Sequence, residues 1–545
     1  MEMAAARKTP TKAFTRALGF VAAVAISASG FFAICAKARA AEGTLVMVVQ
    51  PEPPSLASYI STANPTSVVG SKIYEGLLDY DFSLTPKASL AKSWEVSPDG
   101  KTITFKLQEG VKFHDGTEFT SADVQFSVMD VLKKYHPRGQ ITFRDVEAVE
   151  TPDKYTAVFR LKNPAPYIIR ALSAYESPMV PKHLLSGVDI QTAPLANKPV
   201  GTGPFIFSEW KKGQYIRLDR NPNYRKAGEP KLQRIVMRFI GDAGTRVAAI
   251  EKGEIQYGSL SAVPNIDVKR ISQEKDIKTT TKGNEIINPM IDLELNTKRP
   301  PLDNQKVRQA LAYAMDRQFI VDNIWYGFGR PATGPLHSSL KSIGLYTTEG
   351  MPDFNRADRY EYANKLLDEA GLPRKSDGAR FEITLDLIPF GQEWRRLGEY
   401  LQQSYEKVGV KLNLRYEDFP TWLRRVFTNY DFDMMATVTF TQADPVVGVH
   451  RLYHSRSIQK GTIFVNDTQW SSKKTDDLMD QATVENDPEK RKALYHELQR
   501  DLAEASTVIW VNELSWVTVF RSSVKNVDIS PLGPFSSFST VEVTK

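Results

Sequence analysis

The chain has 545 residues, of which 41% are hydrophobic and 25% are charged, and its formal net charge is +6. Six of the 70 basic residues and one of the 64 acidic residues lie in the first 40 positions, so the rest of the chain carries a net charge near +1. Because a nucleic-acid partner calls for a basic face or stripe, we expect none.

Residues 1–40 have the pattern of a secretory signal peptide. A basic segment precedes the mostly apolar stretch 18–34, and Ala38-Arg39-Ala40 supplies the small-x-small pattern for cleavage before Ala41. An uncleaved membrane anchor is the first alternative, but the apolar stretch is short and contains polar residues. A lipoprotein attached through Cys35 is the second, but Ile34 stands where lipid attachment needs a small residue. We therefore expect a periplasmic protein.

The mature chain would contain no cysteine, because Cys35 is the only one in the sequence. Disulfides, cysteine ligands and a thiol nucleophile are then excluded. About 500 residues without covalent cross-links must depend on large hydrophobic cores, and a typical domain size of roughly 150 residues predicts about three domains.

The first half of the mature chain begins with an apolar strand at 43–49, a proline-rich loop at 51–56 and a helix at 67–78. Residues 101–107 and 154–161 alternate between polar and apolar side chains, which predicts strands. Between them, His114-Asp115-Gly116 predicts a turn and 121–135 a helix. We interpret 81–199 as an inserted α+β domain.

The stretch 199–240 opens with Gly201-Thr202-Gly203-Pro204, a turn in which we expect the glycines to take positive φ. Alternating residues after it predict strands around Phe205 and Ile216 and at 235–240. The glycine spacing does not fit a dinucleotide-binding loop, and no helix follows, so a nucleotide site is not expected.

Strands alternate with helices in the second half, which indicates an α/β lobe. A helix at 245–253 is followed by a strand at 284–296, where we expect the first crossing into this lobe. The other predicted helices cover 304–323, 360–370, 394–408 and 487–504, and the other strands 381–387, 409–416, 431–438 and 508–520. The last strand would return the chain to the first lobe, so the two lobes would meet at a hinge with a cleft between them.

Five motifs in the same order resemble family 5 of the extracytoplasmic solute-binding proteins of ABC importers, the dipeptide/oligopeptide/nickel group. They are the Gly201–Tyr224 block, Leu90-Ala91-Lys92-Ser93-Trp94-Glu95, Gly110-Val111-Lys112-Phe113-His114-Asp115-Gly116, Phe119-Thr120-Ser121-Ala122-Asp123-Val124, and Pro301-Leu302-Asp303 with Lys306-Val307-Arg308-Gln309-Ala310-Leu311. Each motif is modestly specific, whereas five in the right order are very specific, and the resemblance covers nearly the whole mature chain.

This resemblance implies a bilobal α/β periplasmic-binding-protein fold, type II-like and of cluster C, with a ligand cleft between the lobes. Lobe I would comprise 41–80, 200–286 and 514–545, the inserted domain 81–199, and lobe II 287–513. It further implies a monomeric binding protein, not an enzyme, without a cofactor, that delivers a solute to an ABC permease and ATPase in the inner membrane.

The resemblance also implies two ligand contacts. Arg395 matches an arginine that binds the ligand carboxylate in dipeptide binders, a bidentate role suited to a guanidinium. Thr441 stands where those binders have an aspartate for the ligand's α-ammonium, and this departure puts peptide specificity in doubt because a hydroxyl cannot neutralise an ammonium. Asp444 could substitute from nearby or cap a turn beside Pro445, and we expect the rest of the pocket to be shaped by Glu52, Tyr74, Trp422 and Glu513.

Several alternatives remain open. His450 and His454 have a spacing that could chelate a metal, although no carboxylate partner is evident and we expect no metal site. A secreted hydrolase is a remote alternative, because the sequence lacks both a G-x-S-x-G elbow and an H-E-x-x-H motif. The solute could be a short peptide, an opine or an oligosaccharide, and the protein could also act as a receptor that relays its ligand to a sensor.

Overall fold

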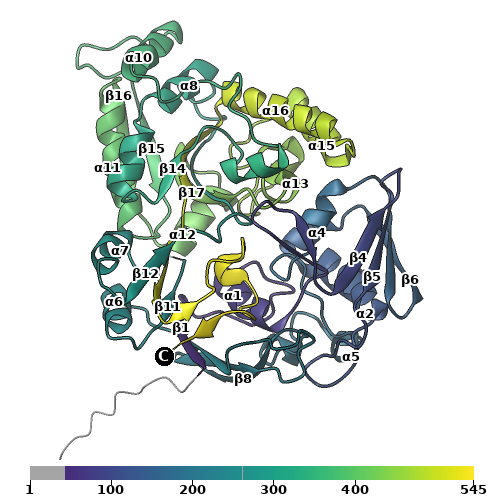
Figure 1. Ribbon diagram of the computed structural model, residues 1–545. Helices are drawn as coiled ribbons and strands as arrows, with labels where there is room; N and C mark the ends of the chain where they lie inside the picture. The colour runs from purple at the N-terminus through teal and green to yellow at the C-terminus, as the bar shows by residue number, and fades with distance from the viewer. Residues whose placement is uncertain (1–42, 261, 545) are drawn as a thin grey trace, which may run out of the picture. The chain divides into compact units, whose positions relative to one another are not determined.

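The computed structural model describes residues 43–260 and 262–544, so the predicted signal peptide lies outside the described residues (Figure 1). Most of the strands belong to three sheets of seven, six and four strands. Within the described residues, no helix is long and apolar enough to cross a membrane.

The seven-stranded sheet has the order β12-β19-β11-β1-β10-β9-β8. Strand β1 pairs in parallel with both β10 and β11, and β19 is antiparallel to β11 and to β12. Strands β1, β10, β11 and β12 therefore end at the same edge of the sheet. Their bounds are β1 Thr44–Val48, β8 Phe205–Lys211, β9 Tyr215–Arg220, β10 Arg234–Arg238, β11 Tyr257–Gly258, β12 Ile277–Thr280 and β19 Thr518–Arg521.

The six-stranded sheet has the order β14-β18-β13-β17-β15-β16. Strand β15 is parallel to β16 and β17, while β13 is antiparallel to both β17 and β18. Strands β15, β16, β17 and β18 therefore share one carboxyl edge. Their bounds are β13 Pro289–Leu295, β14 Gly329–Pro331, β15 Phe381–Leu387, β16 Val410–Arg415, β17 Met434–Phe440 and β18 Val508–Leu514.

The four-stranded sheet is antiparallel and is formed entirely within residues 91–161, in the order β4-β5-β7-β6. Ile103, Phe105 and Leu107 of β5 are buried, as their alternation predicts. Helix α2 (Ser121–Phe126) lies beside β6 and β7 and continues as a helix to Tyr135 (Figure 1). The strands are β4 Ala91–Val96, β5 Thr102–Leu107, β6 Val146–Asp153 and β7 Thr156–Leu161.

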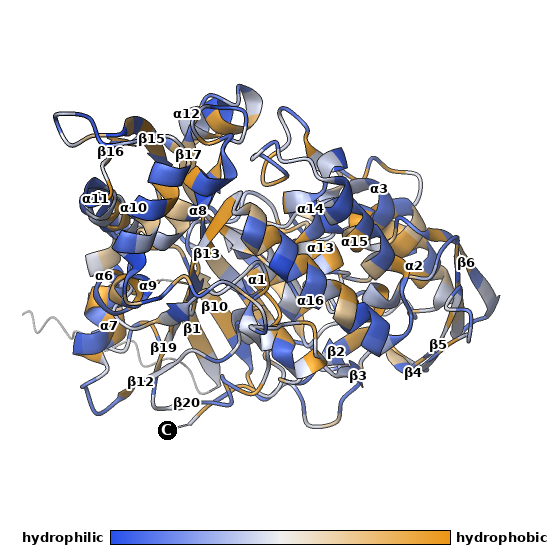
Figure 2. Ribbon diagram, turned by 90° about the horizontal axis from the view of Figure 1, so that it is seen from above, coloured by the Kyte–Doolittle hydropathy of each residue, from blue (hydrophilic) through white to orange (hydrophobic). Residues whose placement is uncertain are grey.

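The larger helices bury apolar faces against the sheets or against neighbouring helices and have polar faces outside. In Figure 2 the strands of the two large sheets are mostly orange, whereas helices such as α11 and α16 show blue faces. The helices with at least seven residues are α1 Asn64–Ile73, α6 Ala243–Glu251, α7 Asn265–Ile271, α8 Gln305–Tyr313, α10 Arg359–Glu369, α11 Gln392–Glu406, α15 Lys473–Val484 and α16 Pro488–Ala505.

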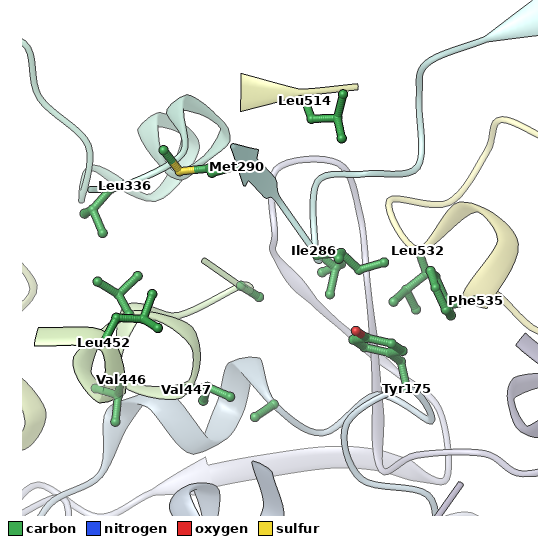
Figure 3. Packing of buried hydrophobic residues seen from close by; sticks show 14 of the residues in the cluster. Tyr175, Ile286, Met290, Leu336, Val446, Val447, Leu452, Leu514, Leu532 and Phe535 are labelled. Atoms are coloured by element: carbon green, nitrogen blue, oxygen red, sulfur yellow. The ribbon is translucent and has the colours of Figure 1, made fainter. Parts of the chain in front are cut away.

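Buried apolar side chains from distant parts of the sequence meet in one cluster (Figure 3). Tyr175, Ile286 and Phe535 lie close together there, and the ring centroids of Tyr175 and Phe535 are 4.8 Å apart. Met290 and Leu514, which belong to the six-stranded sheet, extend the same cluster. The predicted domain limits remain a prediction, but the regions they separate share this hydrophobic contact.

Four predicted elements differ from the structure. The strand predicted at 284–296 covers only Pro289–Leu295, because 284–288 belong to the connection before it. The helix predicted at 304–323 is interrupted after Tyr313, because Asp316 caps a new helix by accepting a hydrogen bond from the Phe319 N–H. The strand predicted at 508–520 is two strands in two different sheets, separated at 515–517. The helix predicted at 67–78 begins earlier, at Asn64, and ends at Ile73, after which residues 74–77 are not helical.

The expected positive φ of Gly201 and Gly203 is wrong, because neither is among the glycines in that conformation in the described residues. Both are needed for a close approach to the end of α1 instead. A Cβ atom at Gly201 would lie 2.1 Å from the Ile73 carbonyl oxygen, and one at Gly203 would lie 2.6 Å from it. The Gly203 N–H donates to this oxygen at 2.8 Å. The motif thus holds the segment just before β8 against the end of α1.

His114, which lies in its own predicted turn at 114–116, also binds the Gly201–Gly203 turn. Its Nε2–H donates to the Gly203 carbonyl oxygen at 3.0 Å, and its Nδ1 accepts from the Gly201 N–H at 3.3 Å. Burial lowers the pKa of His114 to about 4, so the imidazole is neutral at physiological pH and can make both bonds.

We predict that Gly201→Ala lowers the free energy of unfolding by about 2 to 3 kcal/mol, because the new methyl group must displace backbone rather than a flexible side chain. The measurement is urea denaturation of the purified protein. Gly241→Ala is the matched control, since a Cβ atom at Gly241 would meet nothing within 4 Å, and it should change stability by less than about 0.5 kcal/mol. Equal stability of the two variants would contradict the close-approach explanation.

Candidate functional site

The chain passes between the two large sheets twice, and both crossings lie at carboxyl edges. Residues 281–288 connect the end of β12 to the start of β13, and 515–517 connect the end of β18 to the start of β19. The crossings touch, because the Asn284 side-chain amide donates to the Trp516 carbonyl oxygen at 3.1 Å. Open α/β sheets bind ligands outside the carboxyl ends of their strands, so these edges form the candidate site.

Arg395 lies at the carboxyl edge of the six-stranded sheet, near the start of helix α11, which follows β15. Its guanidinium group lies 4.4 Å from the ring centroid of Tyr416, the first residue after β16. Arg395 is exposed and forms no salt bridge with any residue that the structure describes. A stacked, oriented guanidinium without a carboxylate partner is suited to binding an anionic group.

Thr441 lies at the same edge, directly after β17. Its N–H donates to the Asn288 carbonyl oxygen at 3.2 Å, so it contacts the first crossing segment. The side chain is buried, and its hydroxyl has no hydrogen-bond partner within 43–260 and 262–544. The next residue, Gln442, has a φ of 56°, and the Asn288 side chain binds its carbonyl oxygen at 3.1 Å. Thr441 is therefore held firmly in the hinge region.

Glu513 is the penultimate residue of β18 and is almost fully buried. Its carboxylate accepts hydrogen bonds from the Ser338 N–H at 3.0 Å and from the Ser338 hydroxyl at 2.5 Å. Arg330 Nε lies 3.0 Å from the same carboxylate. Burial nevertheless raises the pKa of Glu513 to about 7. This carboxyl group therefore changes its charge near neutral pH.

Two of the predicted ligand contacts, Trp422 and Tyr74, are buried aromatic residues. Trp422 stacks with Phe419, with ring centroids 5.9 Å apart, and contacts Phe427 edge-on. Tyr74 meets Tyr59 edge-on at 6.1 Å, directly after helix α1. Neither the Trp422 N–H nor the Tyr74 hydroxyl has a hydrogen-bond partner among the described residues. Their role as ligand contacts stays a prediction.

Glu52 follows β1 at the carboxyl edge of the seven-stranded sheet. It accepts hydrogen bonds from the Trp210 ring N–H at 2.9 Å and from the Gly213 N–H at 3.0 Å. Both of its oxygens are therefore engaged in bracing the β8–β9 hairpin, and Glu52 positions this edge of the site.

Asp444 has the capping role beside Pro445 that the sequence offered as one of two possibilities, and its role as a ligand contact stays a prediction. It is the N-cap of the short helix α13 (Pro445–Gly448) and accepts from the Val446 N–H. Its two oxygens also form a bidentate ion pair with Arg491, at 2.9 and 2.8 Å, and the pair is almost completely buried. Because Arg491 already balances its charge, Asp444 is not a free carboxylate of the kind that an aspartate at position 441 would supply.

His450 and His454 face different neighbours in the structure. His450 is buried and contacts the Tyr495 hydroxyl at 3.0 Å, whereas His454 lies 3.2 Å from Asp476 and 3.3 Å from Asp480. No group of three or more His, Cys, Asp or Glu residues that could hold a metal ion occurs among the described positions. Burial lowers the pKa of His450 well below its usual value, which fits a neutral core histidine.

Sequence reasoning did not identify Tyr416, Ser338 or Asn288 as parts of this site. Tyr416 ends the predicted strand 409–416, so the rule that carboxyl ends face the ligand could have found it. Ser338 and Asn288 carried no such signal, because their importance depends on contacts with Glu513 and Gln442, which are distant in sequence.

We predict that Glu513→Gln removes the part of the pH dependence of the free energy of unfolding that arises from the Glu513 carboxyl group. The folded-state pKa of Glu513 is raised from 4.5 to about 7, so the folded state binds the proton more tightly and the wild-type protein loses stability as pH rises through this range. Between pH 4.5 and 7 the free energy of unfolding of the variant should rise relative to wild type by up to about 3 kcal/mol. Chemical denaturation at several pH values measures it, and a pH-independent difference would contradict the assignment.

Comparisons with known proteins agree with this arrangement. The family model described as "Bacterial extracellular solute-binding proteins, family 5 Middle" matches residues 85–460. The oligopeptide-binding protein AppA of Bacillus subtilis is 29% identical over 476 residues, covering 85% of this chain and 84% of AppA. The glutathione-binding protein GsiB of Escherichia coli K12 is 27% identical over 508 residues, covering 89% and 90%. The solved structure of Bacillus subtilis AppA with a nonapeptide has a TM-score of 0.76 and 26% identity, and covers 92% of this chain and 99% of AppA.

These findings confirm the resemblance and the α/β fold class of periplasmic binding proteins. They also confirm the expected class of function, because proteins of this group bind small-molecule solutes for ABC transporters, act outside the cytoplasm and are not enzymes. The match extends over more than half of the sequence, and the chain therefore belongs to family 5 of the bacterial extracellular solute-binding proteins.

Proposed function

We propose that the protein captures a small, anionic, peptide-like solute at the joined carboxyl edges of its two large sheets. It would act in the periplasm after removal of residues 1–40, as a monomer without a nucleic-acid partner. It would deliver the solute to an ABC permease and ATPase in the inner membrane. Closure of lobe II over lobe I about the two crossing segments would bury the solute.

The position of Arg395 is the observation that carries this proposal. Its guanidinium lies over the Tyr416 ring at an edge where ligands bind, and it forms no salt bridge with the described residues. Closure would remove this cation from water, so the solute must supply the matching negative charge. A carboxylate can bind a guanidinium through two parallel hydrogen bonds, which gives both affinity and orientation.

Thr441 further restricts the solute. A hydroxyl at this position offers no negative charge to an α-ammonium group, and Asp444 is occupied by Arg491. Glu513 lies at the same edge but is buried and already bound by Ser338 and Arg330. We therefore expect the recognised peptide-like solutes to carry net negative charge rather than a strongly bound free amino terminus. The names of the relatives AppA and GsiB support a peptide or a glutathione-like compound.

A non-peptide anion, such as an opine, is the second candidate. The observation that favours it is the same Thr441, because a solute without an α-ammonium group would need no carboxylate there. The two candidates share the Arg395 contact and differ in whether peptides bind.

We predict that Arg395→Ala weakens solute binding by about 2 kcal/mol, or roughly 30-fold. Thermal unfolding is first measured with di- to pentapeptides, glutathione, opines, oligosaccharides and Ni²⁺ to find a stabilising compound. A ligand at 100 times its dissociation constant adds about 2.7 kcal/mol. Its affinity for the variant is then measured by calorimetry.

Arg396→Ala is the matched control, because the neighbouring Arg396 side chain points to the Tyr326 hydroxyl instead. Its affinity should stay within about threefold of wild type. Equal losses in the two variants would contradict a specific role of Arg395. Stabilisation by oligosaccharides or Ni²⁺ alone would contradict the proposed class of solute.

We predict that Thr441→Asp increases the stabilisation of the protein by peptides with a free amino terminus, because it places a carboxylate at the hinge. In thermal-shift measurements, free di- and tripeptides should gain about tenfold in apparent affinity and their N-acetylated forms should not. Thr441→Asn is the uncharged control. An equal gain for the acetylated peptides would show that position 441 does not face the amino terminus.

A further inference from the structure

A cavity of about 410 Å³ lies far in sequence from the carboxyl-edge residues, at the junction of the four-stranded sheet with the turn between α15 and α16. None of the site residues described above lines it. Its walls come from the β4–β5 hairpin, the segment 165–170 and Asn486, with the lining residues Pro86, Trp94, Val96, Ser97, Pro98, Gly100, Ile103, Ala165, Pro166, Ile169, Arg170 and Asn486. We call it the hairpin cavity.

Contact between the hairpin tip and Asn486 closes one side of the hairpin cavity. Gly100 has a φ of 67°, and a Cβ atom there would lie 1.9 Å from the Asn486 side-chain nitrogen. The hairpin belongs to the predicted inserted domain, whereas Asn486 belongs to predicted lobe II. The cavity is thus built by two regions that are distant in sequence, and its shape depends on their contact.

Part of the wall is apolar. Trp94 supplies an aromatic side chain, three prolines supply rigid apolar surface, and the buried Ile103 supplies an aliphatic one. A cavity of this size with a few polar groups is typical of small-molecule sites. The apolar wall would accommodate the body of an aromatic or short aliphatic compound.

Arg170 gives the hairpin cavity an excess of positive charge. Its nearest carboxylate is that of Asp444, 3.8 Å away, and both oxygens of Asp444 are already bound to Arg491. Two guanidinium groups therefore share one carboxylate. The side chain of Arg170 is only 27% exposed, and its Nε has no hydrogen-bond partner in the part of the chain that the structure describes.

Removal from water makes this excess charge costly, and burial accordingly lowers the pKa of Arg170. An anion in the hairpin cavity would neutralise the second guanidinium and could accept a hydrogen bond from it. The apolar side chains of the wall and the positive charge of Arg170 together favour a ligand with an apolar body and one acidic group.

We propose that the hairpin cavity is a second binding site, separate from the solute site, that takes a small aromatic or short-chain aliphatic carboxylate. The carboxylate binds Arg170, and the apolar part packs on Trp94 and the prolines. Because the wall includes both the hairpin and Asn486, the bound compound stabilises the contact between the four-stranded sheet and the α15–α16 turn.

The test uses benzoate and octanoate as probes at millimolar concentration, with binding to the purified protein measured by calorimetry and by tryptophan fluorescence. Arg170→Gln should weaken binding of both probes at least about tenfold. Trp94→Leu should weaken benzoate similarly and remove the fluorescence change. Thermal unfolding of each variant without probe verifies that it is folded.

Two arginine variants are the controls. Arg160→Gln alters a half-exposed arginine on the same sheet that is paired with Glu150, and it should leave probe binding unchanged. Arg395→Ala alters the solute site and should also leave it unchanged. The proposal is overturned if wild-type protein binds neither probe, if Arg170→Gln binds them normally, or if binding is lost in Arg395→Ala instead.

Discussion

The structure depends on the way in which the chain connects its two large sheets. Both crossings, 281–288 and 515–517, join carboxyl edge to carboxyl edge, and the Asn284–Trp516 hydrogen bond holds them together. As a result, residues at the ends of β15, β16, β17 and β18 lie at the edge where these two connections run. Under the proposed function, binding at this edge would therefore be coupled to movement about the crossings.

Buried charge is the second constraint on this region. Asp444 and Arg491 neutralise each other, and Glu513 is bound by Ser338 and Arg330, so neither carboxylate is available to a ligand as a bare charge. Arg395 is different, because it lies over an aromatic ring and forms no salt bridge within the described residues. This contrast separates groups that maintain the fold from the group that can select a solute.

Much of the fold could be predicted from the sequence, because local patterns determine it. The helix 394–408 and the strand 409–416 are observed as α11 and β16 with ends within two residues, and the helix predicted at 487–504 is observed as α16 with Asp487 as its N-cap. The prediction failed where a single side chain interrupts a periodic pattern, as Asp316 does, and where one apolar run serves two sheets, as 508–520 does.

The site was less predictable, because it depends on pairs that are distant in sequence. The carboxyl-edge rule and the family resemblance placed Arg395 correctly at an edge, but nothing near Asp444 revealed that Arg491, 47 residues later, occupies it. Likewise, the sequence suggests that Gly201 and Gly203 are needed for positive φ, whereas the structure shows that they are needed for the close approach to the Ile73 carbonyl oxygen. This oxygen lies outside the motif, so the motif alone could not reveal it.

A crystal structure of the protein with its co-purified or panel-identified solute tests the central claim most directly. We predict that the solute lies between the carboxyl edges of the two large sheets, with an acidic group bound to Arg395 and no carboxylate near its other end at Thr441. A solute bound elsewhere, or one at this edge with Arg395 facing solvent, would contradict the claim that this arginine selects the ligand.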